Sequence, residues 1–329
     1  MNVLVTGGTG FVGSQLVAAL VRRGDRVRVL RRANSDLIAL NEIPGVEHLI
    51  GDILEPEAVG RAVAGCDLVF HVAALSSYWR AQRDAIYRIN VAGTRTVLEA
   101  CLAARVPRVV FTSSVAAIGM RPDGRPADET TIFDGASTHL AYADSKHQAE
   151  AVVGRLVKLG LDAVIVNPAA VFGPGDHHQI SGSMIVEFAR RSLPAVPPGG
   201  LCVVDVDAVV AGHLAAAERG RTGERYILGG ENLSMREIAA VVCGVVGRSA
   251  PRWTIPAWAL PPAALAIDAF NRVNPKPPTV SGDQTRLSTH NLFFDSNKAV
   301  RELGYPLLPF RGAVERAYAW YKAHGYVKA

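Results

Sequence analysis

The sequence predicts an α/β fold in which a doubly wound parallel sheet is followed by a smaller, less regular C-terminal lobe. Short β-branched runs alternate with amphipathic stretches over the first 170 residues, and this alternation is typical of parallel strands joined by helical crossovers. Beyond residue 168, proline and glycine cluster at 173–175, 194–200 and 251–278. Such clusters indicate shorter and more irregular elements.

Five runs are expected to form buried strands: 3–6, 27–30, 68–73, 108–114 and 163–168. Amphipathic stretches at 14–23 and 91–104 are expected to form helices between them. We therefore expect a first domain over 1–168, with 201–229 returning to it. The segments 169–200 and 230–329 are assigned to the smaller lobe.

Composition excludes several classes of protein. Of the 329 residues, 49% are hydrophobic and 20% are charged, which excludes a disordered chain. The net charge of +5 comes without any Lys/Arg block longer than a pair, so we expect no nucleic-acid partner. The N-terminus lacks the basic start and apolar run of a signal peptide, and prolines interrupt the apolar stretch 255–267, so no membrane span is expected.

The cysteines also indicate a compartment. Four are present, without a C-x-x-C spacing, so neither zinc nor structural disulfides are expected, and a reducing, cytoplasmic location is favoured. Cys101 and Cys243 lie in apolar helical patterns and are expected in the core; the other two are Cys66 and Cys202.

A glycine-rich turn follows the first predicted strand. Gly7 permits a tight turn, Gly10 lets backbone N–H groups approach a pyrophosphate, and Gly13 allows close packing of helix on strand. An anion bound there would lie at the positive end of a helix dipole. The sequence therefore predicts a Rossmann-type dinucleotide site.

The end of the second strand bears on the choice of cofactor. An acidic side chain there would bind the ribose 2′-OH of NAD, but this sequence has Arg31 and Arg32. A guanidinium pairs well with a 2′-phosphate, so the pair favours NADP(H), with NAD(H) as the alternative. The alternative interpretation is that both arginines are solvated loop residues with no role in binding.

A tyrosine and a lysine at Y-x-x-x-K spacing predict the chemistry. Tyr142 and Lys146 would share one helix face, where the ammonium favours the phenolate form of the tyrosine. A phenol with a lowered pKa can exchange a proton with an alcohol that loses a hydride. A strand-end hydroxyl, Ser114 or Ser113, would hydrogen-bond the reacting oxygen.

Motifs along the chain resemble the extended short-chain dehydrogenase/reductase family. Over the first 215 residues the matching segments are TGGTGFVG (6–13), GDI (51–53), HVAA (71–74), NVAGT (90–94), TSS (112–114), YADSK (142–146), NP (167–168) and GPGD (173–176). YILGG (226–230) and AVRELGY (299–305) fit the family's C-terminal part.

The resemblance implies roles for individual residues. It makes Ser114, rather than Ser113, the catalytic hydroxyl beside Tyr142 and Lys146. The cofactor-binding residues that it implies, together with the two arginines above, are Gly7, Gly10, Phe11, Val12, Gly13, Asp52, Ile53, Ala73, Ala74, Asn90, Thr112, Tyr142, Lys146 and Pro168. The expected substrate-binding residues are Ser76, Tyr78, Trp79 and Asn167. It also implies a homodimer formed through the helices around 90–104 and 139–158.

The same resemblance leaves three functions open. Related dehydratases carry Asp-Glu after the strand-end hydroxyl, whereas Val115 and Ala116 stand here, so dehydration is disfavoured. A sugar (nucleotide-sugar) epimerase similar to the hopanoid-associated group is favoured. The alternative is an NADPH-dependent carbonyl reductase similar to dihydroflavonol 4-reductases. A non-catalytic dinucleotide-sensing module is least favoured, because such proteins generally lose the Tyr or the Lys.

Several other residues have more than one interpretation. Trp253 and Trp258 either form an aromatic surface for an apolar ligand or pack within the lobe. His71 is expected to pack or to hydrogen-bond. Adjacent His177 and His178 do not predict a metal site. Asp205 and Asp207 are expected near a strand end where they could close the domain, although Ala208 stands where the family often has a second acid.

Overall fold

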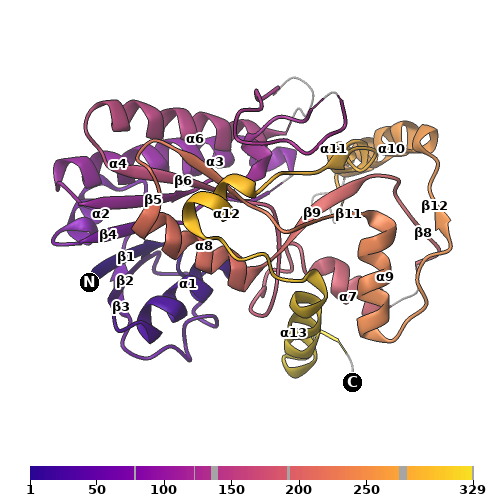
Figure 1. Ribbon diagram of the computed structural model, residues 1–329, viewed down its shortest axis with the longest axis horizontal. Helices are drawn as coiled ribbons and strands as arrows, with labels where there is room; N and C mark the ends of the chain where they lie inside the picture. The colour runs from indigo at the N-terminus through magenta and orange to yellow at the C-terminus, as the bar shows by residue number, and fades with distance from the viewer. Residues whose placement is uncertain (78, 122, 135–139, 191–192, 274–279, 328–329) are drawn as a thin grey trace.

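A seven-stranded parallel sheet forms the centre of the first domain (Figure 1). Its strands run in the order β10-β6-β5-β4-β1-β2-β3, with all neighbours parallel. The bounds are β1 Asn2–Thr6, β2 Arg26–Arg31, β3 Glu47–Ile50, β4 Leu68–His71, β5 Arg108–Thr112, β6 Ala163–Pro168 and β10 Arg225–Leu228. The strand order reverses beside β1, which confirms the doubly wound prediction. The computed structural model describes residues 1–77, 79–121, 123–134, 140–190, 193–273 and 280–327.

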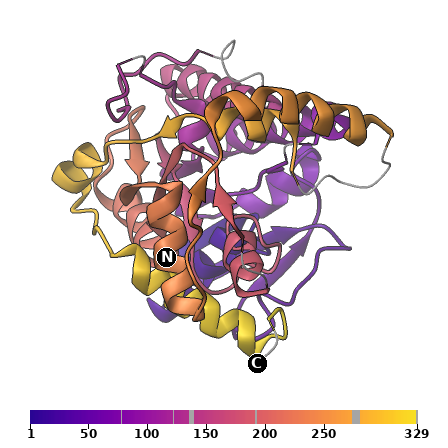
Figure 2. The same ribbon diagram turned by 90° about the vertical axis from the view of Figure 1, so that its right-hand side faces the viewer.

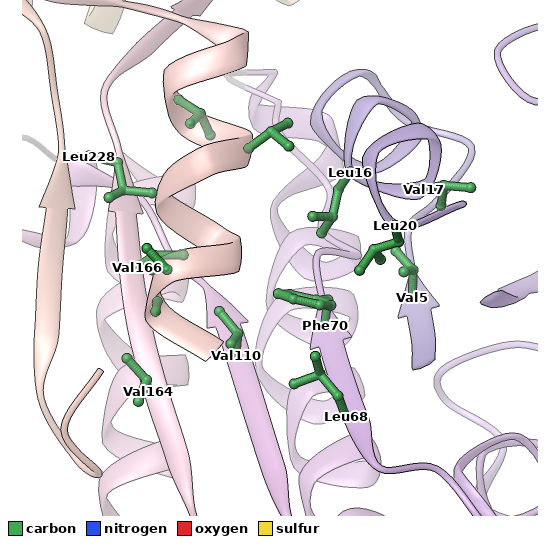
Figure 3. Close-up of a cluster of buried hydrophobic side chains, with 14 of the residues drawn as sticks. Val5, Leu16, Val17, Leu20, Leu68, Phe70, Val110, Val164, Val166 and Leu228 are labelled. Atoms are coloured by element: carbon green, nitrogen blue, oxygen red, sulfur yellow. The ribbon is translucent and has the colours of Figure 1, made fainter. Parts of the chain in front are cut away.

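Helices cover both faces of this sheet, because its strands carry apolar side chains on both sides. Val3 and Val5 belong to a core cluster with α1 (Phe11–Arg22) and α8 (Val206–Arg219). Leu4, between them in sequence, belongs to the opposite cluster with α2 (Pro56–Val63), α4 (Thr94–Ala103) and α6 (Ala141–Lys158). Figure 3 shows Phe70 of β4 and Leu20 of α1 meeting in the first cluster.

The smaller lobe has its own sheet and core. β9 (Gly200–Asp205) pairs with β7 (Ala170–Phe172), β11 (Glu231–Ser234) and β13 (Asn291–Leu292). Three helices pack around this sheet in a separate apolar cluster: α7 (Ser183–Arg190), α9 (Met235–Val246) and α13 (Phe310–Ala323). A further pair of strands joins β8 (Ala195–Val196) to β12 (Trp253–Thr254).

The remaining helices connect these layers. Near the carboxyl ends of β4 and β5 lie η1 (Arg80–Gln82), α3 (Arg83–Tyr87), the π-helical turn η2 (Arg88–Gly93) and η3 (Val115–Ala117). At the far end of the lobe lie η4 (Ala257–Ala259), α10 (Leu260–Val273) and α11 (Gly282–Leu287), visible along the upper edge of the molecule in Figure 2. No helix in the described part of the chain is long and apolar enough to cross a membrane.

The boundary between the two parts differs from the expected one. The return to the first domain begins at α8 rather than at residue 201, because β9 pairs only within the smaller sheet. The C-terminal segment also crosses back, since α12 (Asn297–Leu303) packs against α8 and β10. Two expected strands, 68–73 and 108–114, end two residues early, and the residues that follow them form the site.

Candidate functional site

The glycine turn leaves no room for larger side chains. Gly7 has φ +74°, and a Cβ there would lie 2.6 Å from the Ala73 backbone nitrogen. A Cβ at Gly13 would lie 2.1 Å from the Gly7 carbonyl oxygen, so helix α1 packs directly on the turn. Gly10 is the N-cap of α1 and offers no side chain to the first helical N–H groups. These groups are therefore available to an anion.

Arg31 and Arg32 lie where β2 ends, beside the glycine turn's own strand β1. Arg31 Nε is 3.3 Å from His48 Nδ1, and its Nη1 donates to the Arg32 carbonyl oxygen at 3.3 Å. Both contacts are long, and no carboxylate holds either guanidinium among the described residues. At the next strand end, Asp52 accepts from Leu54 N at 3.0 Å, and buried Ile53 packs on Gly93.

Tyr142 and Lys146 lie one turn apart on α6, at the carboxyl ends of β4 and β5. Hydrogen bonds from Ser114 and Ser76 lower the pKa of the Tyr142 phenol, but burial outweighs them and leaves this pKa above its usual value. Ser114 also accepts from Ala116 N at 3.2 Å, which fixes its hydroxyl at the start of η3. Ser76 contacts the phenol, and its predicted role at the substrate stays a prediction.

The ammonium of Lys146 is buried, with 2% of the side chain exposed. Its Nζ donates to the Thr112 carbonyl oxygen at 2.8 Å and lies 5.2 Å from the centre of the Phe111 ring. Burial lowers the pKa of Lys146 to about 8, and the nearby Glu150 carboxylate partly opposes that shift. Lys146 can therefore change its charge close to neutral pH, which suits a proton-transfer site.

A chain of buried hydrogen bonds links the glycine turn to α6. Thr6 Oγ1 is 2.7 Å from His71 Nδ1, and His71 Nε2 is 3.0 Å from Thr94 Oγ1. Thr94 gives its only hydroxyl hydrogen to the Asn90 carbonyl at 2.6 Å. His71 must then donate from Nε2, which leaves its Nδ1 to accept from the Thr6 hydroxyl when the ring is neutral. Burial favours this neutral form, because it lowers the pKa of His71 to about 3.

The same chain continues through the side chain of Asn90, within the π-helical turn. Asn90 Nδ2 donates to Ser145 Oγ at 2.9 Å, and Ser145 donates to the Tyr142 carbonyl at 2.8 Å. Asn90 Oδ1 accepts from Leu75 N at 2.8 Å. Asn90 thus holds the segment after β4 and helix α6 in register; its predicted contact with a cofactor stays a prediction.

Sequence reasoning missed Glu150, which organises the other side of α6. Its Oε1 accepts from Ser113 Oγ at 2.5 Å and from Asn167 Nδ2 at 2.6 Å, and Arg225 Nη1 lies 3.1 Å from Oε2. Ser113 is thereby occupied, which leaves Ser114 at the phenol. Asn167 is fully buried and also donates to the Ser114 carbonyl at 2.9 Å. The available signal was a carboxylate four residues after Lys146, on the buried face of the helix.

Other predicted residues lie around this centre. Thr112, besides accepting from Lys146, pairs its hydroxyl with His213 Nε2 at 2.9 Å. Pro168 is buried on β6 opposite Leu228 of β10. Trp79 is half-buried in the segment after β4, whereas Tyr78 lies outside the described residues. Asn167 Oδ1 has no hydrogen-bond partner in the described part of the chain, and its role toward substrate stays a prediction.

The remaining expectations concern structural residues. His71 hydrogen-bonds as expected, and Cys101 and Cys243 are buried core residues. All four cysteines are free. Asp205 caps α8 and, with Asp207, binds Arg316 of α13, which ties the two parts together. His177 lies 3.3 Å from Tyr326 Oη, and the described residues contain no group of side chains suited to a metal ion.

The site fits a dinucleotide in three respects. The glycine turn is free of side chains where a pyrophosphate would lie, and α1 begins there. Arg31 and Arg32 lie at the end of β2, next to β1, where the adenosine ribose of a bound dinucleotide would be expected. The hydroxyls of Ser114 and Tyr142, with the Lys146 ammonium, stand at the reactive end.

Comparison with known proteins agrees with this geometry. Residues 3–229 match the family model of the NAD dependent epimerase/dehydratase family. A Synechocystis sp. protein provisionally named dihydroflavonol 4-reductase is 40% identical, with 98% of this chain and 95% of that protein covered. Sterol demethylase protein B of Methylococcus capsulatus is 34% identical, with 99% and 100% covered.

A solved structure resembles the whole chain. The nucleoside-diphosphate-sugar epimerase from Pseudomonas aeruginosa has a TM-score of 0.82 and 26% identity, with 100% of this chain and 99% of that chain covered. The family match over more than two thirds of the chain, on a doubly wound sheet with these motifs, identifies the family. This chain belongs to the NAD-dependent epimerase/dehydratase family, the extended short-chain dehydrogenases/reductases.

Proposed function

We propose that this enzyme is an NADP(H)-dependent oxidoreductase that interconverts a secondary alcohol and a carbonyl group on an apolar substrate. The observation that carries the chemistry is the contact of the Ser114 and Ser76 hydroxyls with the Tyr142 phenol, one helical turn from a buried ammonium. Two observations favour a net redox reaction over epimerisation. They are the arginine pair after β2 and the names of two curated relatives, of which one names a dihydroflavonol reductase and the other a sterol demethylase protein.

The side chains of the site serve mainly to transfer a proton to and from the substrate oxygen. When bound, the nicotinamide dinucleotide supplies or accepts the hydride. Tyr142 gives its phenolic proton to the carbonyl oxygen in reduction and takes it back in oxidation. Lys146 stabilises the phenolate that remains, because its ammonium lies in a buried, low-dielectric site. Ser114 orients the reacting oxygen and shares its hydrogen bond with the phenol.

Arg31 and Arg32 support the NADP(H) preference. Within the described part of the chain, the Arg31 side chain makes only two polar contacts, both at 3.3 Å, to His48 and to the Arg32 carbonyl, and neither is with a carboxylate that would compete with a 2′-phosphate. Replacing both with alanine should weaken NADPH binding by at least about tenfold and leave NADH binding nearly unchanged, since each charge-assisted hydrogen bond contributes about 1.5–3 kcal/mol. Arg26→Ala, at the exposed other end of β2, is the matched control. Tighter binding of NADH than NADPH by the native protein would contradict this part of the proposal.

A sugar-nucleotide epimerase is the second candidate, favoured by the structural match to the Pseudomonas aeruginosa epimerase. Epimerisation returns the hydride to the same substrate and therefore keeps its cofactor. Protein purified without added nucleotide would be denatured and the released compounds identified by mass spectrometry. An empty site that binds NADPH reversibly supports the reductase, whereas near-stoichiometric NAD supports the epimerase.

The test of the chemistry itself is Tyr142→Phe. The loss of one hydroxyl should abolish hydride transfer while NADPH binding stays within about twofold, because the phenol acts on the proton and not on the dinucleotide phosphates. Retained turnover would contradict the assignment for both candidate reactions.

We also propose that the protein is a cytoplasmic homodimer. The four free, buried cysteines are compatible with a reducing compartment. The dimer would form through α4 and α6, the two helices that the family resemblance implies. Light scattering that gives the mass of one chain would contradict the dimer.

A further inference from the structure

Helix α10 exposes large apolar side chains on its outer side. Large apolar side chains usually face the core, but Leu265 and Phe270 on this helix are 65% and 63% exposed, and Trp258 just before it is 78% exposed. Pro262, Ala266 and Ala269 are exposed between them. The five residues on α10 follow the spacing i, i+3, i+4, i+7, i+8, so they share one side of the helix, and Trp258 precedes them in η4. We call these six residues the α10 face.

The opposite side of the helix contains its only carboxylate. Leu260 and Ala264 are buried there. Asp268 binds Arg286 of α11 at 2.7 Å, and Arg286 also binds Asp283 at 2.8 Å. Asp268 lies directly over the first residue of α11, since a Cβ at Gly282 would be 2.4 Å from its carboxyl carbon. The acidic group is therefore neutralised within the lobe, and the outer side stays apolar.

The described residues next to the α10 face in sequence include a cation and no outward acid. Exposed Arg252 precedes it, and among the described residues 251–271 the one carboxylate is the inward-facing Asp268. The chain as a whole carries a net charge of +5. An apolar strip with tryptophan, leucine and phenylalanine, next to a cation and without an outward acid, suits the boundary between acyl chains and anionic headgroups.

We propose that the α10 face docks the enzyme on the surface of an anionic lipid bilayer. The helix would lie in the plane of the interface with Trp258, Leu265 and Phe270 inserted. It runs along an outer edge of the molecule, as Figure 2 shows, so a flat surface can reach it. The proposal uses none of the reacting side chains and holds for either candidate reaction.

Vesicle sedimentation with the full-length protein tests the proposal. Native protein should sediment with vesicles of mixed phosphatidylcholine and phosphatidylglycerol, and less with phosphatidylcholine alone. The triple variant Trp258→Ser, Leu265→Ser, Phe270→Ser should lose at least about tenfold in vesicle affinity, because each inserted side chain contributes about 1.5 kcal/mol or more. Leu159→Ser with Leu307→Ser, also exposed apolar residues, is the matched control and should bind as the native protein does.

Tryptophan fluorescence locates the contact. Two of the four tryptophans, Trp253 and Trp258, lie next to or on the α10 face. Brominated lipids should quench the native protein, and Trp258→Phe should still bind vesicles but lose a large part of that quenching. Because this variant keeps an aromatic side chain at an exposed position, it tests the docking surface even if the triple variant folds poorly.

Three outcomes would overturn the proposal: equal vesicle affinity of the triple variant, an absence of binding by the native protein, and quenching that Trp258→Phe does not change. If the triple variant instead reduces the mass measured by light scattering, with no vesicle binding by either protein, the face binds a second copy and the lipid assignment is wrong. Failure of the hydride-transfer tests would leave all of these outcomes unaffected.

Discussion

Helices α6 and α10 depart from the usual helix pattern in opposite directions. α6 buries Ser145, Lys146 and Glu150 on its core side, whereas α10 exposes Leu265 and Phe270 on its outer side. Every buried polar group of α6 has partners on neighbouring strands or turns. The exposed apolar side chains of α10 lack packing partners that would cover them to a similar extent within the described residues.

The two helices show two kinds of locally unfavourable free energy in a folded protein: buried charged groups and exposed apolar side chains. Burial of an ammonium or a carboxylate costs several kcal/mol unless it is paired, so such groups persist where chemistry needs them. Exposed apolar side chains cost less in the folded chain but promote association. We therefore expect substitutions on α6 to change turnover, stability and pH dependence, and substitutions on α10 to change only association.

The largest expected effect is at Lys146. Lys146→Met should reduce turnover by at least about 10³-fold, because the phenolate loses its cation. The same variant should be more stable at pH 7 by on the order of 1 kcal/mol, since a buried group with a pKa near 8 disfavours folding while it is charged. Urea unfolding and steady-state rates measure both quantities.

The pH dependence gives a second test at the same residue. Between pH 8 and about 10.4 the unfolded chain keeps the Lys146 proton that the folded chain has released, so native stability should rise with pH in this window. The rise should be absent in Lys146→Met. A parallel rise in both proteins would show that Lys146 is not its source.

The next effect is at Glu150. Glu150→Leu leaves Arg225 and the Asn167 amide without their acceptor, so the free energy of unfolding should fall by about 2–4 kcal/mol. Glu150→Gln keeps an acceptor but removes the charge that raises the Lys146 pKa. As the pH rises, the turnover rate of this variant should therefore begin to fall at a lower pH than the rate of the native protein. An unshifted pH profile would mean that Glu150 has a structural role only.

A smaller effect comes from two buried neutral histidines. Burial lowers the pKa of His71 to about 3 and that of His213 to about 4. Below pH 6.5 the unfolded chain therefore binds protons that the folded chain does not, and stability should fall by about 2 kcal/mol for each histidine between pH 7 and pH 5. In His213→Gln the fall should be smaller by that amount; unfolding curves at the two pH values test this.

The smallest effect is expected on α10. Without lipid, Trp258→Ser should change the free energy of unfolding by no more than about 0.5 kcal/mol, because the side chain has few partners to lose. A loss of several kcal/mol in urea unfolding would show that the α10 face packs within the protein, which would remove the contrast with α6.

The sequence predicted the sheet and the placement of Tyr142 and Lys146 on one helix better than it predicted the groups that support them. Local patterns carry strands such as 163–168, which the structure reproduces as β6, and the Tyr142–Lys146 spacing. Glu150 was missed because its partners lie on β5, β6 and β10, and these contacts form only in the folded chain. The position of β9 was missed for the same reason, since a buried strand does not reveal which sheet it joins.

The path of the C-terminal segment has a consequence for synthesis of the protein. Ala299 and Leu303 complete the core of the first domain, and Phe310 and Tyr321 complete that of the smaller lobe. Neither core is whole until the segment 299–321 has left the ribosome. Nascent chains therefore expose apolar surface in both parts until then, and truncation before residue 297 would leave two incomplete cores rather than one intact domain.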